Sequence, residues 1–468
     1  MSGDERTYRV DCTLAPEQIR SALADLLIAA PADQVRPEGV CIDSREARPG
    51  DLFVCLRGAE QDGHEFAAEA VARGAAALMV DHPLASIDVP QWLVRDTLEG
   101  VQALAAWKRS RHPVRVVGIT GSVGKTSTKE LTAAVLGSRY DVLKSRASFN
   151  SETGLPLTLL GLRAGHTLAV LEIGMDAPGE IRRLCALAQP EFGVVLSVGS
   201  AHMEFLGSRE AIADAKAELV ECLPSSGVAV LNADDPYVAL MAARTRAAVL
   251  TFGITSPADV QVEGLSSRGL DGISFRLRSN ARQVEVRSPL LGAHMAYACA
   301  AAASVGMLLG VRLEAAAEVL AHATVPGRMR VVRLAGGGTL LDDAYNASPQ
   351  SVTADLQLLR GLAGPRTAVL GDMLELGPEE VAGHRSVGMA AAACCDRVLA
   401  IGPRALDMAG AAREAGLRDV EWFPDTDAAQ TAVLVAVQRG GHVLFKASRA
   451  MRLERLVAVA EGTACSAH

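Results

Sequence analysis

A glycine-rich stretch, GITGSVGKTST (residues 118–128), follows a run of mostly β-branched apolar residues and places a lysine and a threonine directly after its last glycine. The apolar run is typical of a buried strand, and the glycines allow the chain to turn tightly into a helix. Backbone N–H groups of such a turn point at phosphate oxygens, with the positive end of the helix behind them. The stretch predicts a phosphate-binding loop made of Thr120, Gly121, Ser122, Val123, Gly124, Lys125 and Thr126.

Within this loop we expect Lys125 to reach the β- and γ-phosphates of a nucleotide and the Thr126 hydroxyl to hold Mg²⁺. The spacing departs from the pattern G-x-x-x-x-G-K-[ST], because Ile119 stands where the first glycine belongs. A guanine-nucleotide switch would carry N-K-x-D at a later strand end, and the comparable end here, LNADD (residues 231–235), has no lysine. The sequence therefore disfavours a switch, while Asn232 stays a candidate nucleotide contact.

Two more polar residues follow apolar strands. Glu172 ends the strand in LAVLEIGM, and His202 follows the strand in LSVGSAHMEF. The carboxyl ends of parallel strands meet at one edge of a sheet, so both side chains should face the same crevice as Thr126. Mg²⁺ prefers oxygen ligands, which makes Glu172 the stronger candidate ligand and leaves a core histidine as an alternative for His202.

Lysine is rare in this chain. Of 46 basic residues only six are lysines: Lys108, Lys125, Lys129, Lys144, Lys216 and Lys446. Arginine cannot lose its proton or act as a nucleophile, so a lysine that persists in an arginine-rich chain is a candidate for work that needs a compact amine. Solvated positions explain Lys108 and Lys144 equally well. Lys216 lies in the amphipathic stretch REAIADAKAEL, where we favour a functional amine over a solvated one.

The length, charge and composition of the whole chain limit its possible functions. Its 468 residues suffice for about three domains. A net charge of -8 argues against a nucleic-acid partner. The nine cysteines form no C-x-x-C pair and the amino terminus lacks a secretory signal, which predicts reduced thiols in the cytoplasm. The longest uncharged run, residues 288–311, is rich in Ala and Gly and predicts a buried core helix, so we expect no membrane insertion.

The order of the expected elements divides the chain into three α/β domains. Residues 1–98 hold short apolar runs between turns and predict a small α/β domain. In residues 99–325 strands and helices alternate, which predicts a P-loop ATPase-type domain with a mostly parallel sheet. The alternation starts again in residues 326–468 and predicts a Rossmann-like carboxyl-terminal domain.

Several longer motifs resemble a known family. The central ones are similar to the ATPase domain of the Mur ligases, the cytosolic enzymes that build the peptidoglycan stem peptide: TGSVGKTST, EIGM, SVGSAHMEFLGSREAIADAKAEL and LNADDP. The flanking motifs resemble the family member that adds a dipeptide: IDSREARPGDLFVCLRGAEQDGHEF (residues 42–66), PGRM (326–329), LDDAYNASPQS (341–351), VLGDMLELG (369–377) and FKASRAM (445–451). The D-N-P-R motif expected of the diaminopimelate-adding member is absent.

The resemblance implies an ADP-forming amide ligase with ATP and Mg²⁺. ATP would phosphorylate the terminal carboxylate of a UDP-N-acetylmuramoyl-tripeptide, and the amine of D-alanyl-D-alanine would attack the acyl phosphate. In the family the lysine that matches Lys216 is carbamylated and binds a second Mg²⁺. Arg328 would contact the γ-phosphate and Asp343 the ribose, and both belong to the third domain. We also expect the chain to act as a monomer.

The same matching implies substrate contacts. Residues of the first domain would hold the UDP-sugar: Ser44, Arg45, Asp62, Gly63 and His64. Asn150 and Thr153 would line the path toward the peptide, while Tyr345 and Asn346 lie in the motif that would meet the dipeptide. One helix start departs from the family pattern G-x-H-N-x-x-N, because GAHMAYA (residues 292–298) has Met295 and Ala298 in place of both asparagines. We expect this departure to weaken adenine recognition.

Two other functions share parts of the pattern. A folylpolyglutamate synthase has the same central domain and the same acyl-phosphate chemistry, but it would not need the Asp43-Ser44-Arg45 stretch in front of the ATPase. A nucleotide-gated binding protein could keep the fold without catalysis. The joint presence of Lys125, Glu172, His202 and Lys216 favours an enzyme instead.

Overall fold

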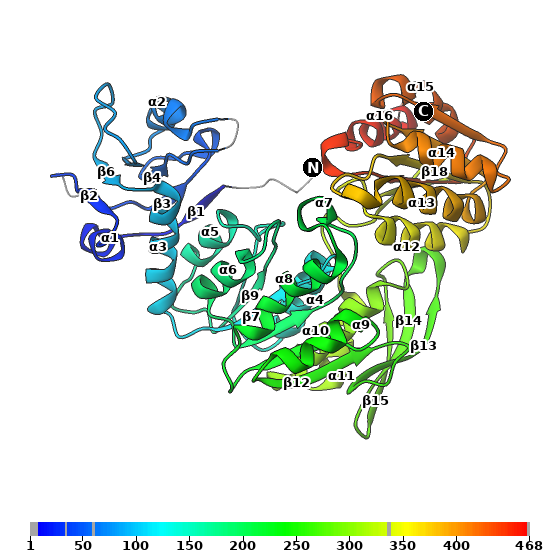
Figure 1. The fold of residues 1–468 in the computed structure, drawn as a ribbon, viewed down its shortest axis with the longest axis horizontal. Coiled ribbons are helices and arrows are strands. Elements are labelled where there is room, and N and C mark those ends of the chain that lie inside the picture. Colours follow the sequence, from blue (N-terminus) through cyan, green and yellow to red (C-terminus); the bar gives the residue numbers. More distant parts are fainter. Residues whose placement is uncertain (1–7, 33–34, 59–60, 335–337, 466–468) are drawn as a thin grey trace.

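The structure is a computed structural model that describes residues 8–32, 35–58, 61–334 and 338–465. Within these residues the chain forms a six-stranded, a nine-stranded and a second six-stranded sheet in chain order, each flanked by helices. Figure 1 shows the first and third units at opposite sides, with the nine-stranded unit between and below them. Residues 1–7, on which the expected lack of a secretory signal partly depends, lie outside the described residues.

The first sheet has the strand order β1-β3-β4-β5-β6-β2, parallel from β3 to β6 with an antiparallel strand at each edge. A buried ion pair joins β1 to β4, because Nε of Arg9 donates to Oδ2 of Asp51 at 2.7 Å. The elements are β1 (Arg9–Asp11), α1 (Pro16–Leu23), β2 (Leu27–Ala29), β3 (Gly39–Cys41), η1 (Ser44–Glu46), β4 (Asp51–Val54), η2 (Gly63–Phe66), α2 (Ala67–Ala72), β5 (Ala77–Val80) and β6 (Gln91–Val94).

The central sheet has the order β15-β14-β13-β12-β11-β10-β7-β9-β8 and is parallel from β8 to β13. Strands buried on both faces read as continuous apolar runs, which is why they were visible in the sequence. Their elements are α3 (Thr97–Ser110), β7 (Arg115–Thr120), α4 (Lys125–Gly137), β8 (Val142–Lys144), α5 (Gly154–Leu160), β9 (Leu168–Glu172), α6 (Glu180–Ala188), β10 (Phe192–Val195), α7 (Met203–Leu206), α8 (Arg209–Glu221), β11 (Val228–Asn232), α9 (Pro236–Leu240), η3 (Met241–Arg244), β12 (Ala248–Gly253), α10 (Met295–Leu308) and α11 (Leu313–His322).

An antiparallel extension was not expected from the sequence. The strands β13 (Val260–Ser267), β14 (Ile273–Ser279) and β15 (Arg282–Ser288), with η4 (Gly269–Asp271), continue the central sheet as a meander. The sequence of β14, ISFRLRS, alternates buried and partly exposed residues, which is the period of a strand with one covered face. Asn280 supplies the positive φ of 51° at the β14–β15 turn.

The Ala-rich run forms a core helix, as predicted. α10 is buried on nearly all sides and packs against α4 and against β11, β12 and β13 of the central sheet. Gly306 allows a close approach, because a Cβ there would lie 2.7 Å from Cγ1 of Val135. In the described part of the chain no helix is long and apolar enough to cross a membrane.

The third sheet has the order β16-β17-β21-β18-β19-β20, parallel except for β16 at its edge. This is the doubly wound arrangement that the sequence predicted for the last part of the chain. The elements are β16 (Arg330–Arg333), β17 (Thr339–Asp342), α12 (Pro349–Arg360), β18 (Arg366–Gly371), η5 (Gly377–Glu379), α13 (Glu380–Cys394), β19 (Arg397–Ile401), α14 (Ala405–Glu414), β20 (Val420–Phe423), α15 (Thr426–Gln438), β21 (His442–Lys446), η6 (Arg449–Met451) and α16 (Glu454–Cys465).

Candidate active site

A cavity of about 1120 Å³ lies between the central and third units, at the carboxyl ends of β7, β9 and β11. Ligands bind at this edge of an open parallel sheet. Most of the site residues predicted from the sequence line the cavity: Ser122, Val123, Gly124, Lys125, Thr126, Asn150, Thr153, Glu172, His202, Asn232, Arg328, Asp343, Tyr345 and Asn346. Thr120, Gly121 and Lys216 do not belong to its wall, and the five predicted UDP-sugar residues lie on the first unit.

The phosphate-binding loop joins β7 to α4. Gly124 caps α4 with a φ of 86°, a left-handed conformation that glycine adopts without steric cost. At Gly121 the φ is 153°, and a Cβ would lie 2.9 Å from Cβ of Leu196. Nζ of Lys125 donates to the carbonyl of Gly121 at 2.8 Å, so the amine folds back across the loop. Burial lowers the pKa of Lys125, and the Glu172 carboxylate partly opposes this effect.

Glu172 and Thr126 form the centre of the cavity. Glu172 is 1% exposed, and its Oε2 accepts from the Thr126 hydroxyl at 3.0 Å while Oε1 accepts from Nδ2 of Asn150 at 2.8 Å. The Thr126 hydroxyl also accepts from Nη2 of Arg328, a residue of the loop that leads into the third unit, at 3.3 Å. A carboxylate and a hydroxyl beside a phosphate-binding loop are oxygen donors of the kind that Mg²⁺ takes.

His202 lies between two carboxylates of different units. Its Nδ1 is 3.0 Å from Oδ1 of Asp176 in the central unit and 3.3 Å from Oε2 of Glu375 in the third unit. Burial disfavours the charged imidazole, but the two carboxylates outweigh it and raise the pKa of His202. Contact with His202 in turn lowers the pKa of Asp176. The sequence predicted His202 at the metal but did not identify either carboxylate.

Lys216 is buried on α8, with an exposed fraction of 1%. Burial lowers its pKa well below the usual value, and the neighbouring Lys125 ammonium lowers it further while Asp176 opposes. A solvated-face lysine is thereby excluded. An amine in this environment carries the neutral form far more readily than an exposed lysine does.

The third unit contributes a buried group of three charges. Nζ of Lys446 contacts Oδ2 of Asp343 and lies 2.9 Å from Oδ2 of Asp355, while Oδ1 of Asp343 accepts the backbone N–H of Met329. Burial raises the pKa of Asp355 to about 7. Lys446 and Arg328 overcome the effect of burial on Asp343 and hold its pKa at about 2.

Tyr345 connects the two units at the mouth of the cavity. Its hydroxyl lies 2.9 Å from Oγ of Ser148 in the central unit, and the guanidinium of Arg328 stacks 4.7 Å from its ring centre. Arg449 approaches the same ring at 5.6 Å. The side chain of Asn346 is hydrogen-bonded to its own backbone segment, because its Oδ1 accepts the N–H of Ala347.

The far end of the cavity is built from β11 and α10. Met295 and Ala298 are both buried and line the wall, where the family pattern has asparagines. Asn232 is engaged with the protein, because Nδ2 donates to the Leu196 carbonyl at 2.8 Å and Oδ1 accepts the N–H of Asp234. The hydroxyl of Tyr297 donates to the same Asp234 at 2.9 Å.

The residues predicted to hold the UDP-sugar follow two adjacent parallel strands of the first sheet. Ser44 begins η1 after β3, and Gly63 begins η2 after β4; both turns pack against α2. Oγ of Ser44 donates to Oε2 of Glu69 at 2.6 Å. Arg45 is exposed and pairs with Asp43. The two motifs therefore lie next to the same helix of this unit.

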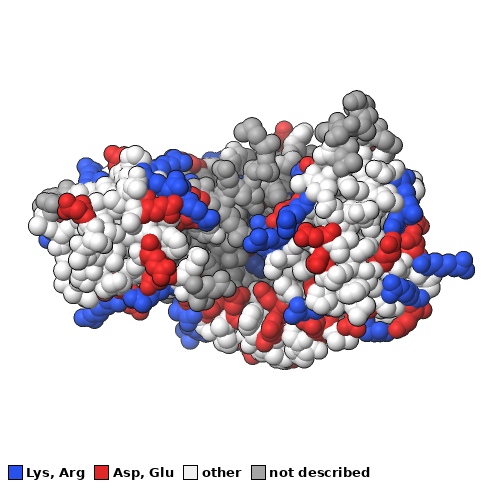
Figure 2. All heavy atoms as spheres, turned by 90° about the horizontal axis from the view of Figure 1, so that it is seen from above, with Lys and Arg blue, Asp and Glu red and all other residues white. Residues whose placement is uncertain are grey.

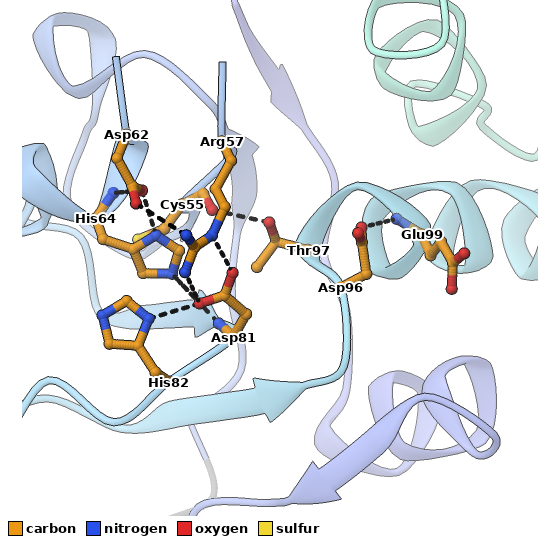
Figure 3. Close-up of polar contacts among 9 residues, drawn as sticks. All are labelled: Cys55, Arg57, Asp62, His64, Asp81, His82, Asp96, Thr97 and Glu99. Atoms are coloured by element: carbon orange, nitrogen blue, oxygen red, sulfur yellow. Dashed lines mark hydrogen bonds and ion pairs between the residues drawn. The ribbon is translucent and has the colours of Figure 1, made fainter. Parts of the chain in front are cut away.

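His64 is held by hydrogen bonds at both ring nitrogens (Figure 3). Its Nε2 accepts the backbone N–H of Asp81 at 3.2 Å, so Nδ1 carries the proton and donates to Oδ1 of Asp62 at 2.5 Å. Its side chain is 4% exposed. His64 therefore orients Asp62 and the start of η2 from inside the protein instead of presenting a ring to solvent.

The donors of His64, Asp81 and His82 lie within 4.8 Å of one another, close enough for a metal ion. Two contacts argue for a hydrogen-bond network instead. Both nitrogens of His64 are already used, and Nε of Arg57 donates to Oδ2 of Asp81 at 2.6 Å, which places a guanidinium where a cation would have to sit. Figure 3 shows Arg57 and His82 converging on the Asp81 carboxylate.

Positive side chains border the space between the outer units. Figure 2 shows Lys and Arg on the facing edges of the first and third units. Asp and Glu side chains lie beside them on the same edges. Basic side chains placed there can contact anionic groups locally, although the chain as a whole carries a net charge of -8.

Comparisons with known proteins agree with this geometry. Models of the Mur ligase family catalytic domain, the Mur ligase middle domain and the Mur ligase glutamate ligase domain match residues 37–115, 119–306 and 327–449. The chain is 38% identical over 437 residues to the UDP-N-acetylmuramoyl-tripeptide–D-alanyl-D-alanine ligase of Escherichia coli, covering 92% of this chain and 95% of that protein. The chain belongs to the Mur ligase family.

Solved structures of Mur ligases have the same fold. MurF from Acinetobacter baumannii superposes with a TM-score of 0.87 at 29% identity, over 97% of this chain and all of that one. MurF from Thermotoga maritima, solved in complex with ADP, gives a TM-score of 0.80 at 30% identity, over 92% of this chain and 98% of that one. A folylpolyglutamate synthase from Mycobacterium tuberculosis, at 18% identity and a TM-score of 0.61, shares the fold alone.

Sequence reasoning missed several residues of this Mur ligase site. Asp176 and Glu375 lie in the EIGMD and GDMLELG stretches. Neither stretch has a local pattern that predicts contact of both carboxylates with His202. Asp355 lies inside α12 and has no motif of its own. Lys446 had one signal, since it is among the six lysines of an arginine-rich chain.

Proposed function

We propose that this chain catalyses the ATP-dependent addition of D-alanyl-D-alanine to UDP-N-acetylmuramoyl-tripeptide, a step of peptidoglycan precursor synthesis. One observation carries the proposal: the phosphate-binding loop, Glu172 and residues of the third unit line one cavity. The chain that forms this cavity matches the Escherichia coli ligase along nearly its whole length. ADP bound to the Thermotoga maritima relative supports ATP as the phosphoryl donor. We place the enzyme in the cytoplasm, as a monomer without a nucleic-acid partner.

The reaction begins with activation of a carboxylate, which is a poor electrophile at neutral pH. The γ-phosphoryl group of ATP moves to the terminal carboxylate of the tripeptide, and ADP leaves. The amine of the dipeptide then forms a bond to the acyl carbon, the carbon–oxygen bond to phosphate breaks, and inorganic phosphate leaves. Both steps gain from cations and N–H groups fixed around the phosphates, because negative charge develops there.

The phosphate-binding loop supplies these groups. The backbone N–H groups at the amino terminus of α4, residues 124–126, would face the β-phosphate, whereas those of Ser122 and Val123 donate to Ser197 in this structure. Lys125 would exchange its contact with the Gly121 carbonyl for the phosphates, which a flexible side chain can do at little cost. Arg328, held by stacking on Tyr345, would meet the γ-phosphate from the side of the third unit. Asp343 would accept hydrogen bonds from the ribose.

The residues around Glu172 fit Mg²⁺. Thr126 and Glu172 offer oxygen donors, and a buried carboxylate with a nearby hydroxyl is a donor set of the right charge. Bound there, Mg²⁺ would neutralise charge on the β- and γ-phosphates. His202 would close the site, and Lys216, with its depressed pKa, would react as a neutral amine with carbon dioxide and add a carbamate oxygen.

The remaining predicted residues would hold the other substrates. Asn150, which orients Glu172, and Thr153 at the start of α5 would face the peptide. Tyr345 and Asn346 would face the dipeptide. Ser44, Arg45, Asp62, Gly63 and His64 would form the UDP-sugar site on the first unit, with His64 acting from inside.

An ADP-release assay tests the proposal. The wild-type enzyme is mixed with ATP and Mg²⁺, and UDP-linked peptides and D-alanyl-D-alanine are added separately and together. We expect steady ADP release only when both substrates are present, with one new amide bond per ADP by mass spectrometry. Steady ADP release without either substrate would contradict a ligase, and product formation with glutamate in place of the dipeptide would favour a folylpolyglutamate-type reaction.

A further inference from the structure

Lys129 is a buried lysine that the proposed chemistry does not use. It lies on α4 one turn after Lys125, and its exposed fraction is 0%. Nζ donates to the carbonyl of Ala147 at 2.6 Å and lies 3.0 Å from Oε1 of Glu130. An ammonium is costly to bury even when it is paired, whereas an apolar side chain of the same length would pack there at no such cost. A core role alone does not account for it.

The carbonyl that Lys129 holds belongs to a strained residue. Ala147 has a φ of 41°, in the left-handed region that residues with a Cβ rarely adopt. Strain of this kind persists only where surrounding contacts enforce it. The charge-assisted hydrogen bond from Lys129 is such a contact, because it fixes the direction of the Ala147 peptide group from outside the loop.

Ala147 lies in the loop between β8 and α5, and we call residues 145–150 of that loop the junction loop. At one side this loop meets the first unit. Nη1 of Arg146 donates to the carbonyl of Arg9 at 3.0 Å, and the ring of Phe149 stacks on Tyr8 at 5.2 Å between centres. Both contacts are to residues at the start of β1 and just before it.

The other contacts of the junction loop lead to the reaction centre and to the third unit. Nδ2 of Asn150 donates to Oε1 of Glu172, and Oγ of Ser145 accepts the backbone N–H of Glu172 at 3.1 Å. Oγ of Ser148 lies 2.9 Å from the hydroxyl of Tyr345. One loop of six residues therefore touches all three units and orients the carboxylate at the centre of the cavity.

We propose that Lys129 is a positioning residue for the ligase reaction: it holds the junction loop in its strained conformation, so that Glu172 is aligned when the first and third units engage their substrates. This inference rests on the proposed function. It assigns to α4 a second task besides phosphate binding, because one turn of the same helix carries Lys125 toward the nucleotide and Lys129 toward the loop. The chain keeps a lysine here because the loop needs a long, charged donor.

Lys129→Met tests this role, since methionine keeps the length and apolar contacts of the side chain and removes the donor. We expect kcat/KM for the UDP-tripeptide to fall at least tenfold, while the Kd for ADP alone, measured by calorimetry, changes less than twofold. Lys144→Met is the matched control: Lys144 contacts the same Glu130 but is exposed and does not reach the Ala147 carbonyl. Its kinetics should stay within twofold of the wild type.

A second substitution separates positioning from general stability. Glycine adopts a φ of 41° freely, so Ala147→Gly should relieve the loop of its need for Lys129. We expect the double variant, Lys129→Met with Ala147→Gly, to regain at least threefold of the lost kcat/KM, although the change of alanine to glycine alone alters the wild type less than twofold. A variant that only destabilised the core would gain nothing from a more flexible loop.

Three results would overturn the inference: unchanged kcat/KM in Lys129→Met, an equal loss of ADP affinity, or no recovery in the double variant. If Lys129→Met does not fold, the same comparison is made with Lys129→Gln, which keeps an uncharged donor, with and without Ala147→Gly. A failure of the proposed function is distinguishable, because the wild type itself would then lack ADP release dependent on both substrates.

Discussion

Replacing Asp355 with asparagine removes one charge from the buried group in the wall of the third unit. Asp343 and Asp355 share a single ammonium, that of Lys446, and all three side chains are at least nine-tenths buried. Lys446 contacts Asp343 more closely, which leaves Asp355 as the carboxylate that is poorly compensated. Burial raises the pKa of Asp355 to about 7, with the charge of Asp343 adding to the effect and Lys446 opposing it.

The magnitude follows from the two pKa values. An unfolded aspartate titrates near pH 4, so the displacement is about three pH units, or roughly 4 kcal/mol at most. Because the folded pKa is the higher one, the folded state binds more protons between pH 4 and pH 7. The contribution of Asp355 to stability is therefore fully present below about pH 4 and is lost as the pH rises through about 7.

The neighbouring charged groups change their contributions to stability outside the pH range of 4 to 7 in which that of Asp355 changes. The depressed pKa of Asp343, about 2, gives a contribution that is present above pH 4 and lost only as the pH falls toward 2. The pKa of Lys446 is raised, because the two carboxylates outweigh burial, and its contribution is lost only at strongly alkaline pH. The raised pKa of His202 is the same in both proteins, so its effect cancels in a comparison.

Thermal unfolding of the wild type and of Asp355→Asn between pH 5 and pH 8 measures the effect. We expect the variant to be less stable than the wild type, or equally stable, at pH 5 and to gain on it steadily up to pH 8, by up to about 3 kcal/mol, because the rest of the roughly 4 kcal/mol is already lost between pH 4 and pH 5. Asp427→Asn, which removes an exposed carboxylate from the first turn of α15, is the control and should show no such trend. A difference between variant and wild type that is constant from pH 5 to pH 8 would refute the reasoning.

The other predictions concern catalysis. Lys216→Arg should lower kcat by about 10²-fold or more, because arginine cannot form a carbamate, and Lys216→Ala should be partly rescued by acetate; an active arginine variant would contradict this role. Restoring asparagine at both Met295 and Ala298 should lower the KM for ATP relative to GTP by up to about tenfold, and an unchanged ratio of kcat/KM would place base recognition elsewhere. Arg328→Lys should lower kcat by about 10²-fold, since lysine cannot both stack on Tyr345 and reach the phosphates. Rates measured at saturating ATP would distinguish this loss from weaker ATP binding, and an unchanged kcat would contradict the role of Arg328.

The parallel part of the central sheet was the part of the fold that the sequence predicted best. Most of its parallel strands are buried on both faces, so they appear as short apolar runs, and most are followed by a helix. The amphipathic stretch that contains Lys216 forms α8, and Oγ of its cap residue Ser208 accepts the N–H of Ala211. The meander was missed because β14 alternates buried and partly exposed residues and β15 is largely polar, so no continuous apolar run marks these strands.

The sequence predicted those site residues that lie at the end of a strand or in the turn that follows it. The turn after β7 and the strand ends at Glu172 and Asn232 are local features, and the structure brings them to one cavity. Contacts that join distant segments left no local trace. The pairing of His202 with Glu375 and of Ser148 with Tyr345 depends on how two sheets face each other, which no periodicity in either segment encodes.

The contacts between units explain why the site is divided among them. An acyl phosphate hydrolyses if water reaches it, so the groups that promote its formation should be complete only when the cavity is closed. The Thr126 hydroxyl meets this condition: it donates to Glu172 of its own unit and accepts from Arg328, which arrives with the third unit. His202 meets it as well, because its second carboxylate partner, Glu375, comes from the third unit. The third unit thus adds a hydrogen bond to Thr126 and an ion-pair partner to His202. Both groups have their full set of partners only when the central and third units face each other across the cavity.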